Sequence, residues 1–345
     1  MYGFIITILL GTGLLMLPYS TTGGIFIIDA FFTATSAVCV TGLIVKNTAA
    51  DFTFFGKAVI LFLIQVGGLG YMSMATFIAL LAGKKIGITQ RMMIKESLNI
   101  VSHEGLVKFV KGMLLFVLAA EGLGTALLYS RFAGEYNTGE SFFLALFHSI
   151  SAFNNAGFSL FEDNLIGYRS DVLMNLSIMS LVFFGGIGFS VVDDIYGRIR
   201  RQEKRVMLHT RLALITSGIL IIAGAALIYV NEREYLFLQS GFGGAESVLS
   251  SLFASVTSRT AGFNTVDYSL LQPATLFLTI ILMFIGASPG STGGGIKTTT
   301  FSIILLHIWS TIRGRQETVA FSRRIPPDFV SRSLVILSLS VIYIT

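Results

Sequence analysis

The chain contains one short turn in three copies: Ala37-Val-Cys-Val-Thr-Gly-Leu43, Ala152-Phe-Asn-Asn-Ala-Gly-Phe158 and Thr257-Ser-Arg-Thr-Ala-Gly-Phe263. Each copy follows an apolar stretch that is too short to span a membrane, since a stretch of about 10–14 residues is typical of a buried or re-entrant helix. These stretches are Ile25–Val38, Ser141–Phe153 and Glu246–Thr257. The polar turn after each stretch must be buried in protein or line water, because lipid tolerates no unpaired backbone group.

The turns are part of an internal repeat. Their glycines lie 115 and 105 residues apart, and a second glycine cluster begins 24 to 28 residues after each of them. The two sets of landmarks are Gly42, Gly157 and Gly262, followed by Gly67, Gly185 and Gly286. Because two landmarks stay in register over three copies, we expect three units of similar structure. Each unit would contain a span, a re-entrant pore helix, the turn and a second span.

The composition is that of a membrane protein. Of the 345 residues, 53% are hydrophobic and 12% are charged, whereas soluble domains carry about 25% charged residues. This difference argues against a soluble enzyme, a disordered chain and a nucleic-acid-binding domain, despite the net charge of +5. The single cysteine and four histidines show no metal-binding spacing, and no Ser/His/Asp set or pair of carboxylates indicates catalysis. We therefore predict an all-α membrane protein that is not an enzyme.

The basic residues predict which loops are cytoplasmic. Of the 24 Lys and Arg, 17 fall in three connectors, and the connectors between these are acidic. Because short basic loops stay in the cytoplasm, we predict cytoplasmic loops at residues 83–106, 197–210 and 313–332. The remaining chain divides into repeat 1 (1–82), repeat 2 (107–196), repeat 3 (211–312) and the start of a truncated repeat 4 (333–345).

Three such turns can form a cation site without any carboxylate. A re-entrant helix directs its C-terminal end, which carries about half a negative elementary charge, toward the membrane interior. Carbonyl oxygens beyond that end can replace the water shell of an ion. Glycine permits the unusual backbone angles that turn these carbonyls inward. Dipoles bind a cation less tightly than a full charge does, so a bound ion can still leave quickly.

Five motifs together resemble the Trk/Ktr/HKT superfamily of potassium transporters, and most of all the bacterial Ktr membrane subunit. They are Thr35-Ser-Ala-Val-Cys-Val-Thr-Gly-Leu43, Gln65-Val-Gly-Gly-Leu-Gly70, Ser151-Ala-Phe-Asn-Asn-Ala-Gly-Phe158, Thr257-Ser-Arg-Thr-Ala-Gly-Phe-Asn264 and Gly286-Ala-Ser-Pro-Gly-Ser-Thr-Gly-Gly-Gly-Ile-Lys297. The resemblance implies potassium-channel-like units of span, re-entrant pore helix and span around a central pore. It implies four such units, and the chain shows three, so we expect a fragment that lacks most of the fourth repeat.

The resemblance also implies that the turns form a selectivity filter that binds potassium through main-chain carbonyls. The filter residues would be Cys39, Val40, Thr41, Gly42, Asn154, Asn155, Ala156, Gly157, Arg259, Thr260, Ala261 and Gly262. Within the superfamily a serine in the first turn accompanies sodium selectivity, so Gly42 favours potassium. We expect the side chain of Arg259 to lie behind the filter, where carbonyls or an acid would bind it, because a cation cannot occupy the ion path.

The stretch from Gly286 to Lys297 breaks a predicted span. It resembles a phosphate-binding loop, G-x-x-x-x-G-K-[ST], but Ile296 separates Gly295 from Lys297, so we reject nucleotide binding there. A break of this length must lie under a water-filled cavity or inside protein. The resemblance implies an intramembrane gate loop just inside the filter. Its residues would be Gly286, Ala287, Ser288, Pro289, Gly290, Ser291, Thr292, Gly293, Gly294, Gly295 and Lys297.

Two further features of the spans allow two interpretations each. The glycines at positions 67, 68, 70, 185, 186 and 188 are interpreted as close helix packing rather than as hinges. Glu121 lies in the middle of a span, where an acid is by default a functional candidate. We favour a structural hydrogen bond for it, because the superfamily's coupling chemistry does not clearly rest on this position.

These observations predict potassium uptake through a gated filter by a multi-pass protein of the cytoplasmic membrane. The resemblance implies a homodimer in the lipid bilayer, resting on a cytosolic ring of nucleotide-binding regulatory subunits that dock on the basic loops. It implies no covalently bound cofactor and no nucleic acid, and it makes sodium a candidate stimulator. Two alternatives stay open: a sodium- or proton-coupled symporter of the same superfamily, and an unrelated alternating-access transporter, although the latter usually has inverted repeats.

Removal of the segment 286–297 tests the gate assignment. If this segment obstructs the ion path, deleting it should raise the flux of rubidium, a potassium analogue, into vesicles that contain the complete protein. Unchanged flux per transporter would remove the gate assignment.

Overall fold

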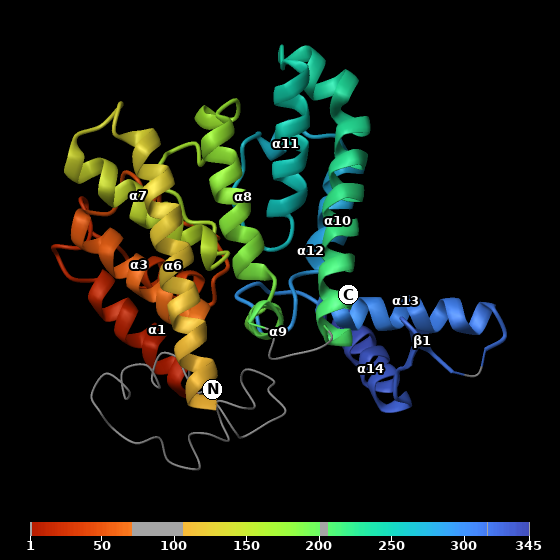
Figure 1. The fold of residues 1–345 in the computed structure, drawn as a ribbon. Coiled ribbons are helices and arrows are strands. Elements are labelled where there is room, and N and C mark those ends of the chain that lie inside the picture. Colours follow the sequence, from red (N-terminus) through yellow and green to blue (C-terminus); the bar gives the residue numbers. More distant parts are fainter. Residues whose placement is uncertain (1, 71–105, 201–205, 316, 345) are drawn as a thin grey trace.

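The computed structural model describes residues 2–70, 106–200, 206–315 and 317–344 (Figure 1). Almost all of the loop predicted at 83–106 lies outside the described residues, as do the inner end of the span predicted to reach residue 82 and part of the basic loop at 197–210. The described chain is mostly helical. Its strands form one short antiparallel hairpin, in which β1 (Val319–Ala320) pairs with β2 (Arg323–Arg324).

The helices occur in one order three times, a first helix followed by a short helix and then a second apolar helix. The helices of the first unit are α1 (Tyr2–Leu15), α2 (Ile27–Val38) and α3 (Phe54–Leu69). Those of the second unit are α6 (Leu106–Phe132), α7 (Thr138–Phe153) and α8 (Val172–Gly186). Those of the third unit are α10 (Leu208–Glu232), α11 (Gly244–Thr257) and α12 (Pro273–Phe284). Single-turn segments η1 (Ile166–Tyr168), η2 (Arg233–Phe237) and η3 (Tyr268–Leu270) lie in the connectors.

Local sequence explains where several of these helices begin. The side chains of Thr53, Asn137 and Asp171 accept hydrogen bonds from the backbone N–H groups three residues later. A side-chain oxygen at this position satisfies one of the N–H groups that a helix leaves unpaired at its start. Pro273 opens α12, where its fixed φ angle suits the first turn and its missing N–H is not needed.

The second span of the second unit is broken, whereas the sequence predicted a single span at this place in each unit. Helix α8 ends at Gly186, and α9 (Phe189–Ile199) continues from it at an angle of 93°. Gly188 lies at the bend with a φ of +94°, a conformation that favours glycine. Gly70 ends α3 in the same region of φ, at +75°. Both glycines mark helix ends. The packing interpretation is wrong for Gly70, where nothing lies within 4 Å of an added Cβ, but at Gly188 such an atom would lie 2.5 Å from the Pro289 carbonyl oxygen, so that glycine also packs closely.

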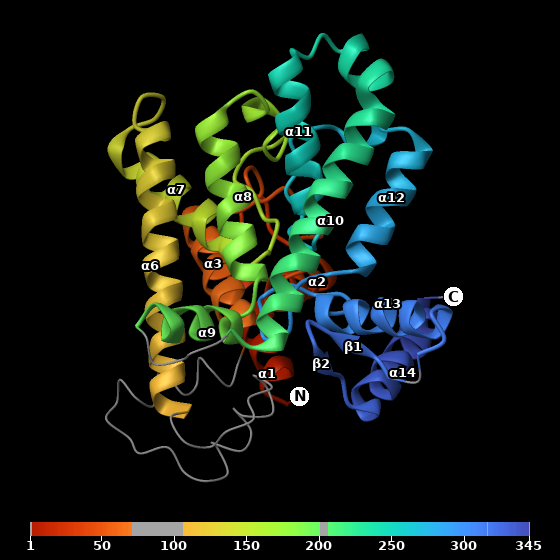
Figure 2. The ribbon, with the colours of Figure 1, turned by 45° about the vertical axis from the view of Figure 1, so that its right-hand side comes forward.

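The last helices lie across the others. Figure 2 shows α9 and α13 (Thr298–Ile312) oriented across α6 and α10. Helix α14 (Pro327–Ile344) packs against α13 and begins six residues before the predicted start of repeat 4. The chain between α12 and α13 is not helical, as expected for the break at 286–297.

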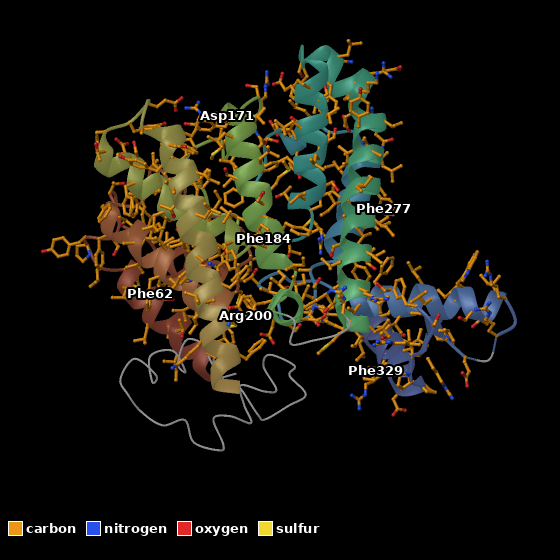
Figure 3. The ribbon with its side chains drawn as sticks, viewed as in Figure 1. Phe62, Asp171, Phe184, Arg200, Phe277 and Phe329 are labelled. Atoms are coloured by element: carbon orange, nitrogen blue, oxygen red, sulfur yellow. The ribbon has the colours of Figure 1, made fainter. Side chains whose placement is uncertain are left out.

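Some of the helices have the length and apolar surface that crossing a bilayer requires. Among the described residues two are long and apolar enough to cross a membrane, Phe109–Phe132 and Leu208–Phe237, and the bent pair α8–α9 can count as a third. Large apolar side chains remain exposed, including Phe62 (55%) and Phe277 (65%), which are labelled in Figure 3. Such an extensive apolar exterior is unfavourable in water. The fold is that of an all-α, multi-pass membrane protein.

Glycine allows the first helix of each unit to approach its neighbours closely. A Cβ added at Gly124 would lie 2.5 Å from the hydroxyl of Ser149, and one at Gly224 would lie 2.5 Å from that of Ser255. At Gly11 it would meet Leu63 at 2.7 Å. Small residues at such crossings give the van der Waals contact that holds helices together in lipid.

Two glycines of α6 provide a matched test of this packing. We expect Gly124→Ala to destabilise the protein by about 1–3 kcal/mol, because the added methyl overpacks the crossing. Gly122→Ala should cause no loss, because nothing lies within 4 Å of its Cβ position. Thermal unfolding of both variants in detergent measures the difference. Equal loss of stability in both would contradict the packing argument.

Candidate cation site

The three glycine turns converge in the structure. A Cβ added at Gly42 would lie 2.6 Å from the carbonyl oxygen of Ala156, and one at Gly157 would lie 2.8 Å from that of Ala261. The Cα of Gly262 would be 2.8 Å from the same added atom at Gly157. The turns of neighbouring units are thus in contact through their backbones, and a side chain at either glycine would push them apart.

The backbone has the same handedness in all three turns. Gly42, Gly157 and Gly262 have φ values of +77°, +71° and +80°. Two residues earlier, non-glycine residues also have positive φ: Val40 at +54°, Asn155 at +57° and Thr260 at +68°. Residues of opposite handedness alternate, and such alternation turns successive peptide groups to the same side of the chain. A left-handed residue other than glycine is strained by about 1–3 kcal/mol and persists only where its surroundings impose it.

Similar hydrogen bonds shape the turns, joining residues five apart in the first two turns and four apart in the third. The N–H groups of Thr41, Ala156 and Ala261 donate to the carbonyls of Ser36, Ser151 and Thr257, at 2.9, 2.8 and 2.9 Å. In the second and third turns a side-chain hydroxyl also donates a hydrogen bond to a carbonyl later in the chain. Ser151 donates to the carbonyl of Phe158 at 2.8 Å, and Thr257 to that of Phe263 at 2.6 Å. These bonds connect the last turn of the helix to the residue that follows the glycine.

The arrangement has the chemistry of a site for a weakly held cation. Helices α2, α7 and α11 end at the turns, so their C-terminal dipoles make the region negative. Carbonyl oxygens are ligands for alkali cations. The part of the chain that the structure describes contains no group of three His, Cys, Asp or Glu side chains that could hold a metal ion.

The loop between α12 and α13 lies directly against the turns. The hydroxyl of Thr292 donates to the carbonyl of Phe153 at 3.1 Å, and the N–H of Gly294 donates to the hydroxyl of Thr260 at 2.9 Å. A Cβ at Gly293 would lie 3.2 Å from the amide nitrogen of Asn155. The filter and gate residues predicted from the sequence are thus neighbours in the fold.

The loop is held by its own backbone and by the broken end of α8. Within it, Ala287 N–H donates to the Gly294 carbonyl at 3.0 Å, and the Lys297 ammonium donates to the Gly293 carbonyl at 2.7 Å. Toward α8, Ser288 N–H donates to the Gly186 carbonyl at 2.9 Å. Non-helical backbone is tolerated within a membrane protein where, as here, protein groups satisfy its hydrogen bonds.

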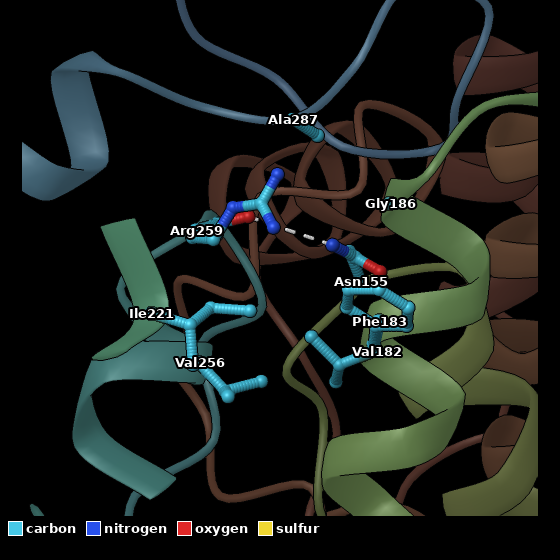
Figure 4. Close-up of a pocket in the computed structure, with 8 residues that line it drawn as sticks. All are labelled: Asn155, Val182, Phe183, Gly186, Ile221, Val256, Arg259 and Ala287. Carbon is cyan, nitrogen blue, oxygen red and sulfur yellow. Dashed lines mark hydrogen bonds between the residues drawn. The ribbon is translucent and has the colours of Figure 1, made fainter. Parts of the chain in front are cut away.

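The hydrogen bonding of the Arg259 side chain differs from what the sequence predicted. Its side chain is buried, with 5% exposed, and its Nε and Nη2 atoms have no hydrogen-bond partner among the described residues. The expected bonds to carbonyls or to an acid are therefore not found there. The guanidinium lies near Ala287 of the loop (Figure 4), in a cavity of about 10 Å³, about the space that one water molecule needs.

Sequence reasoning missed the polar side chains that hold the site together. Ser151 and Thr257 were quoted only as parts of a motif, although a hydroxyl residue stands five or six residues before each turn glycine. A hydroxyl residue that recurs near the same place in all three copies was a usable signal. The bonds of Thr260 and Thr292 had no such signal, because each of these residues contacts a segment far away in sequence.

Comparison with known proteins identifies the family. A family model described as TrkH, cation transport protein, matches residues 3–345. The chain belongs to the TrkH family of cation transport proteins. It is 44% identical to Ktr system potassium uptake protein B of Bacillus subtilis (strain 168), covering 97% of this chain and 75% of the relative. It is 39% identical to potassium/sodium uptake protein NtpJ of Enterococcus hirae, covering 99% of this chain and 76% of that relative.

A solved structure of the TrkH family has the same fold. The crystal structure of the potassium transporter TrkH from Vibrio parahaemolyticus matches with a TM-score of 0.68 and 22% identity, over 96% of this chain and 67% of that one. At this identity the likeness concerns the fold alone. The resemblance inferred from the five motifs is confirmed by the family model and by the relatives.

Two Thr→Val variants test the hydroxyl that supports the third turn. Thr257→Val removes the bond to the Phe263 carbonyl and should lower the free energy of unfolding by about 1 kcal/mol. Thr279→Val is the control, because its hydroxyl donates only to the Thr275 carbonyl on its own helix. Thermal unfolding in detergent gives both values. A loss for Thr279→Val as large as that for Thr257→Val would contradict a special role of the turn bond.

Proposed function

We propose that this TrkH-family protein takes up potassium through the three-turn site. The observation that carries the proposal is the contact of Gly42, Gly157 and Gly262 around turns of equal handedness. Relatives that are 44% and 37% identical are named potassium uptake proteins, which supports potassium as the ion.

The main-chain oxygens of the turns would form the selectivity filter. We assign this role to residues 39–42, 154–157 and 259–262. Their carbonyls would replace the water around a dehydrated potassium ion, which is the transported substrate. The alternating handedness supports the assignment, because it lets successive carbonyls act on one side of each turn. Binding by dipoles alone leaves the ion free to move on.

The loop at residues 286–297 would act as the gate. Its contacts with Phe153 and Thr260 support this role, because they place it next to the filter residues. Few bonds hold it there: three hydroxyl-mediated contacts to the turns and three backbone bonds to α8 and α9. Movement of the loop would open the inner side of the filter.

The membrane, partners and stimulator are part of the same proposal. We place the protein in the cytoplasmic membrane as a homodimer that rests on a cytosolic ring of nucleotide-binding regulatory subunits. The division into repeats at 1–82, 107–196, 211–312 and 333–345 is retained with it. Sodium would act as a stimulator. The family membership and the relatives named Ktr system proteins support these assignments.

Sodium transport is the second candidate. It is favoured by one observation: a relative 39% identical to this chain is named a potassium/sodium uptake protein. A protein of this kind would carry sodium as well as potassium, or couple one to the other. Gly42 argues for potassium, since the first turn has no serine.

Rubidium uptake distinguishes the two candidates. The complete protein, expressed in cells that lack other potassium uptake systems, should take up rubidium with little inhibition by sodium. Gly42→Ser should reduce this preference at least about tenfold, because the side chain meets the Ala156 carbonyl and shifts the turn; tenfold corresponds to about 1.4 kcal/mol. Gly13→Ser is the control, since nothing lies within 4 Å of its Cβ position.

The outcomes separate clearly. Rubidium uptake that sodium inhibits equally well in wild type and in Gly42→Ser would favour the sodium candidate. Absence of rubidium uptake by the wild-type protein, at a normal amount in the membrane, would overturn potassium uptake itself.

A further inference from the structure

A buried acid is bonded to one of the proposed filter residues. The amide nitrogen of Asn154 donates to the Oε1 atom of Glu121 at 3.1 Å. It also donates to the Oε1 atom of Gln65 at 3.1 Å and to the Ile150 carbonyl at 2.9 Å. The amide nitrogen of Gln65 donates to the Oε2 atom of Glu121 at 3.3 Å. Helices α3, α6 and α7 each contribute one residue to this network.

Two of the three side chains of the network are buried, and Gln65 is partly exposed. Asn154 is fully buried and Glu121 is 5% exposed. Gly68 packs so closely on the Asn154 amide that a Cβ there would overlap it. Both carboxylate oxygens of Glu121 accept bonds from amide N–H groups, and no Lys or Arg of the described residues pairs with it. Burying a carboxylate without a cationic partner costs free energy, which its hydrogen bonds must offset. An acid kept at such a position is therefore a candidate for a functional role.

The repeats show that the scaffold does not need an acid at this position. Ser149 donates to the Glu121 carbonyl at 2.7 Å, and Ser255 donates in the same way to the Ile221 carbonyl at 2.8 Å. Three residues after each acceptor comes the packing glycine of that unit, Gly124 or Gly224. In the first unit the residue three before Gly11 is Ile8. Two units therefore have isoleucine where the second unit has Glu121.

The interface between the second and third units can be compared with the one between the first and second units, which contains the network. The cavity beside the third turn is lined by Phe183, Gly186, Ile221 and Arg259. By their place in the repeat these correspond to Gln65, Gly68, Glu121 and Asn154. One interface between units therefore has a polar network in which the Asn154 amide nitrogen and both Glu121 carboxylate oxygens are hydrogen-bonded, while the Asn154 Oδ1 atom has no partner among the described residues. The other interface has an arginine with unpartnered nitrogens. Of these two interfaces, only the one at the second turn has the polar network.

We propose that Glu121 is a positioning residue that fixes the second filter turn through Asn154 and so sets the selectivity for potassium over sodium. The inference rests on the proposed filter function. Asn154 caps α7, and its backbone leads into the left-handed Asn155. With its amide held by three acceptors, Asn154 has one orientation. Loss of the carboxylate would release the amide and allow the carbonyls of the turn to adapt to a smaller ion.

Three variants of the complete protein test the proposal in rubidium uptake assays. The readout is the sodium concentration that halves uptake, divided by the KM for rubidium. Glu121→Ile introduces the residue of the other units and should lower this ratio about tenfold, as expected for losing a hydrogen bond to a charged group. Glu121→Gln keeps one acceptor and should lower it about twofold to fivefold, as for a neutral bond. Asn154→Ala should equal Glu121→Ile, and the double variant should show no further loss.

Thr125→Val is the matched control. Thr125 lies one turn after Glu121 on α6, is buried, and donates to the Glu121 carbonyl rather than to its carboxylate. The ratio of the half-inhibiting sodium concentration to the KM for rubidium should be the same in Thr125→Val as in the wild type.

A merely structural acid would reduce the amount of transporter, or the maximal rate, without moving the ratio. An unchanged ratio in Glu121→Ile overturns the proposal. If that variant does not reach the membrane, an unchanged ratio in the isosteric Glu121→Gln overturns it instead. Additive losses in the double variant would also overturn it, because they would show that Glu121 acts independently of Asn154. Absence of rubidium uptake by the wild type would instead refute the proposed function.

Discussion

The fold depends on one constraint: backbone polar groups that leave a helix inside a membrane need partners within the protein. The chain leaves its helices at the three turns and in the loop between α12 and α13. In each of these non-helical segments, specific hydrogen bonds satisfy backbone groups. The turns are connected back to the helices that precede them, and the loop bonds to itself and to the broken end of α8. The same groups that meet this constraint also form the candidate cation site.

Close approach makes this arrangement possible. Glycine lets the turns touch through their backbones, and it lets the first helix of each unit pack on the short helix beside it. Because no side chains intervene, carbonyl oxygens from units far apart in sequence come together. A single added methyl at these points would separate the units, so the site and the packing of the membrane helices depend on the same residues.

The repeats are alike in backbone but not in chemistry. All three turns share their handedness, yet the residue three before the glycine is Cys39, Asn154 or Arg259. Each of the latter two lies at an interface with the preceding unit, and each has a different environment. Asn154 is bonded by Gln65 and Glu121, whereas Arg259 lies beside a small cavity with two unpartnered nitrogens. The shared backbone conformation gives the three turns a common shape, and the different side chains give each turn its own surroundings.

The sequence by itself determined the membrane class, the three turns, the short helices before them and the break at 286–297, because apolar length, glycine and basic loops are local signals. It also led to the family, which the comparisons confirm. The 93° bend after Gly186 and the early start of α14 were not predictable, since an apolar run reads the same whether straight or bent. Only the tertiary structure decided which polar groups meet. Glu121 with Asn154, and Thr292 with the Phe153 carbonyl, are pairs far apart in sequence, and no local pattern records such contacts.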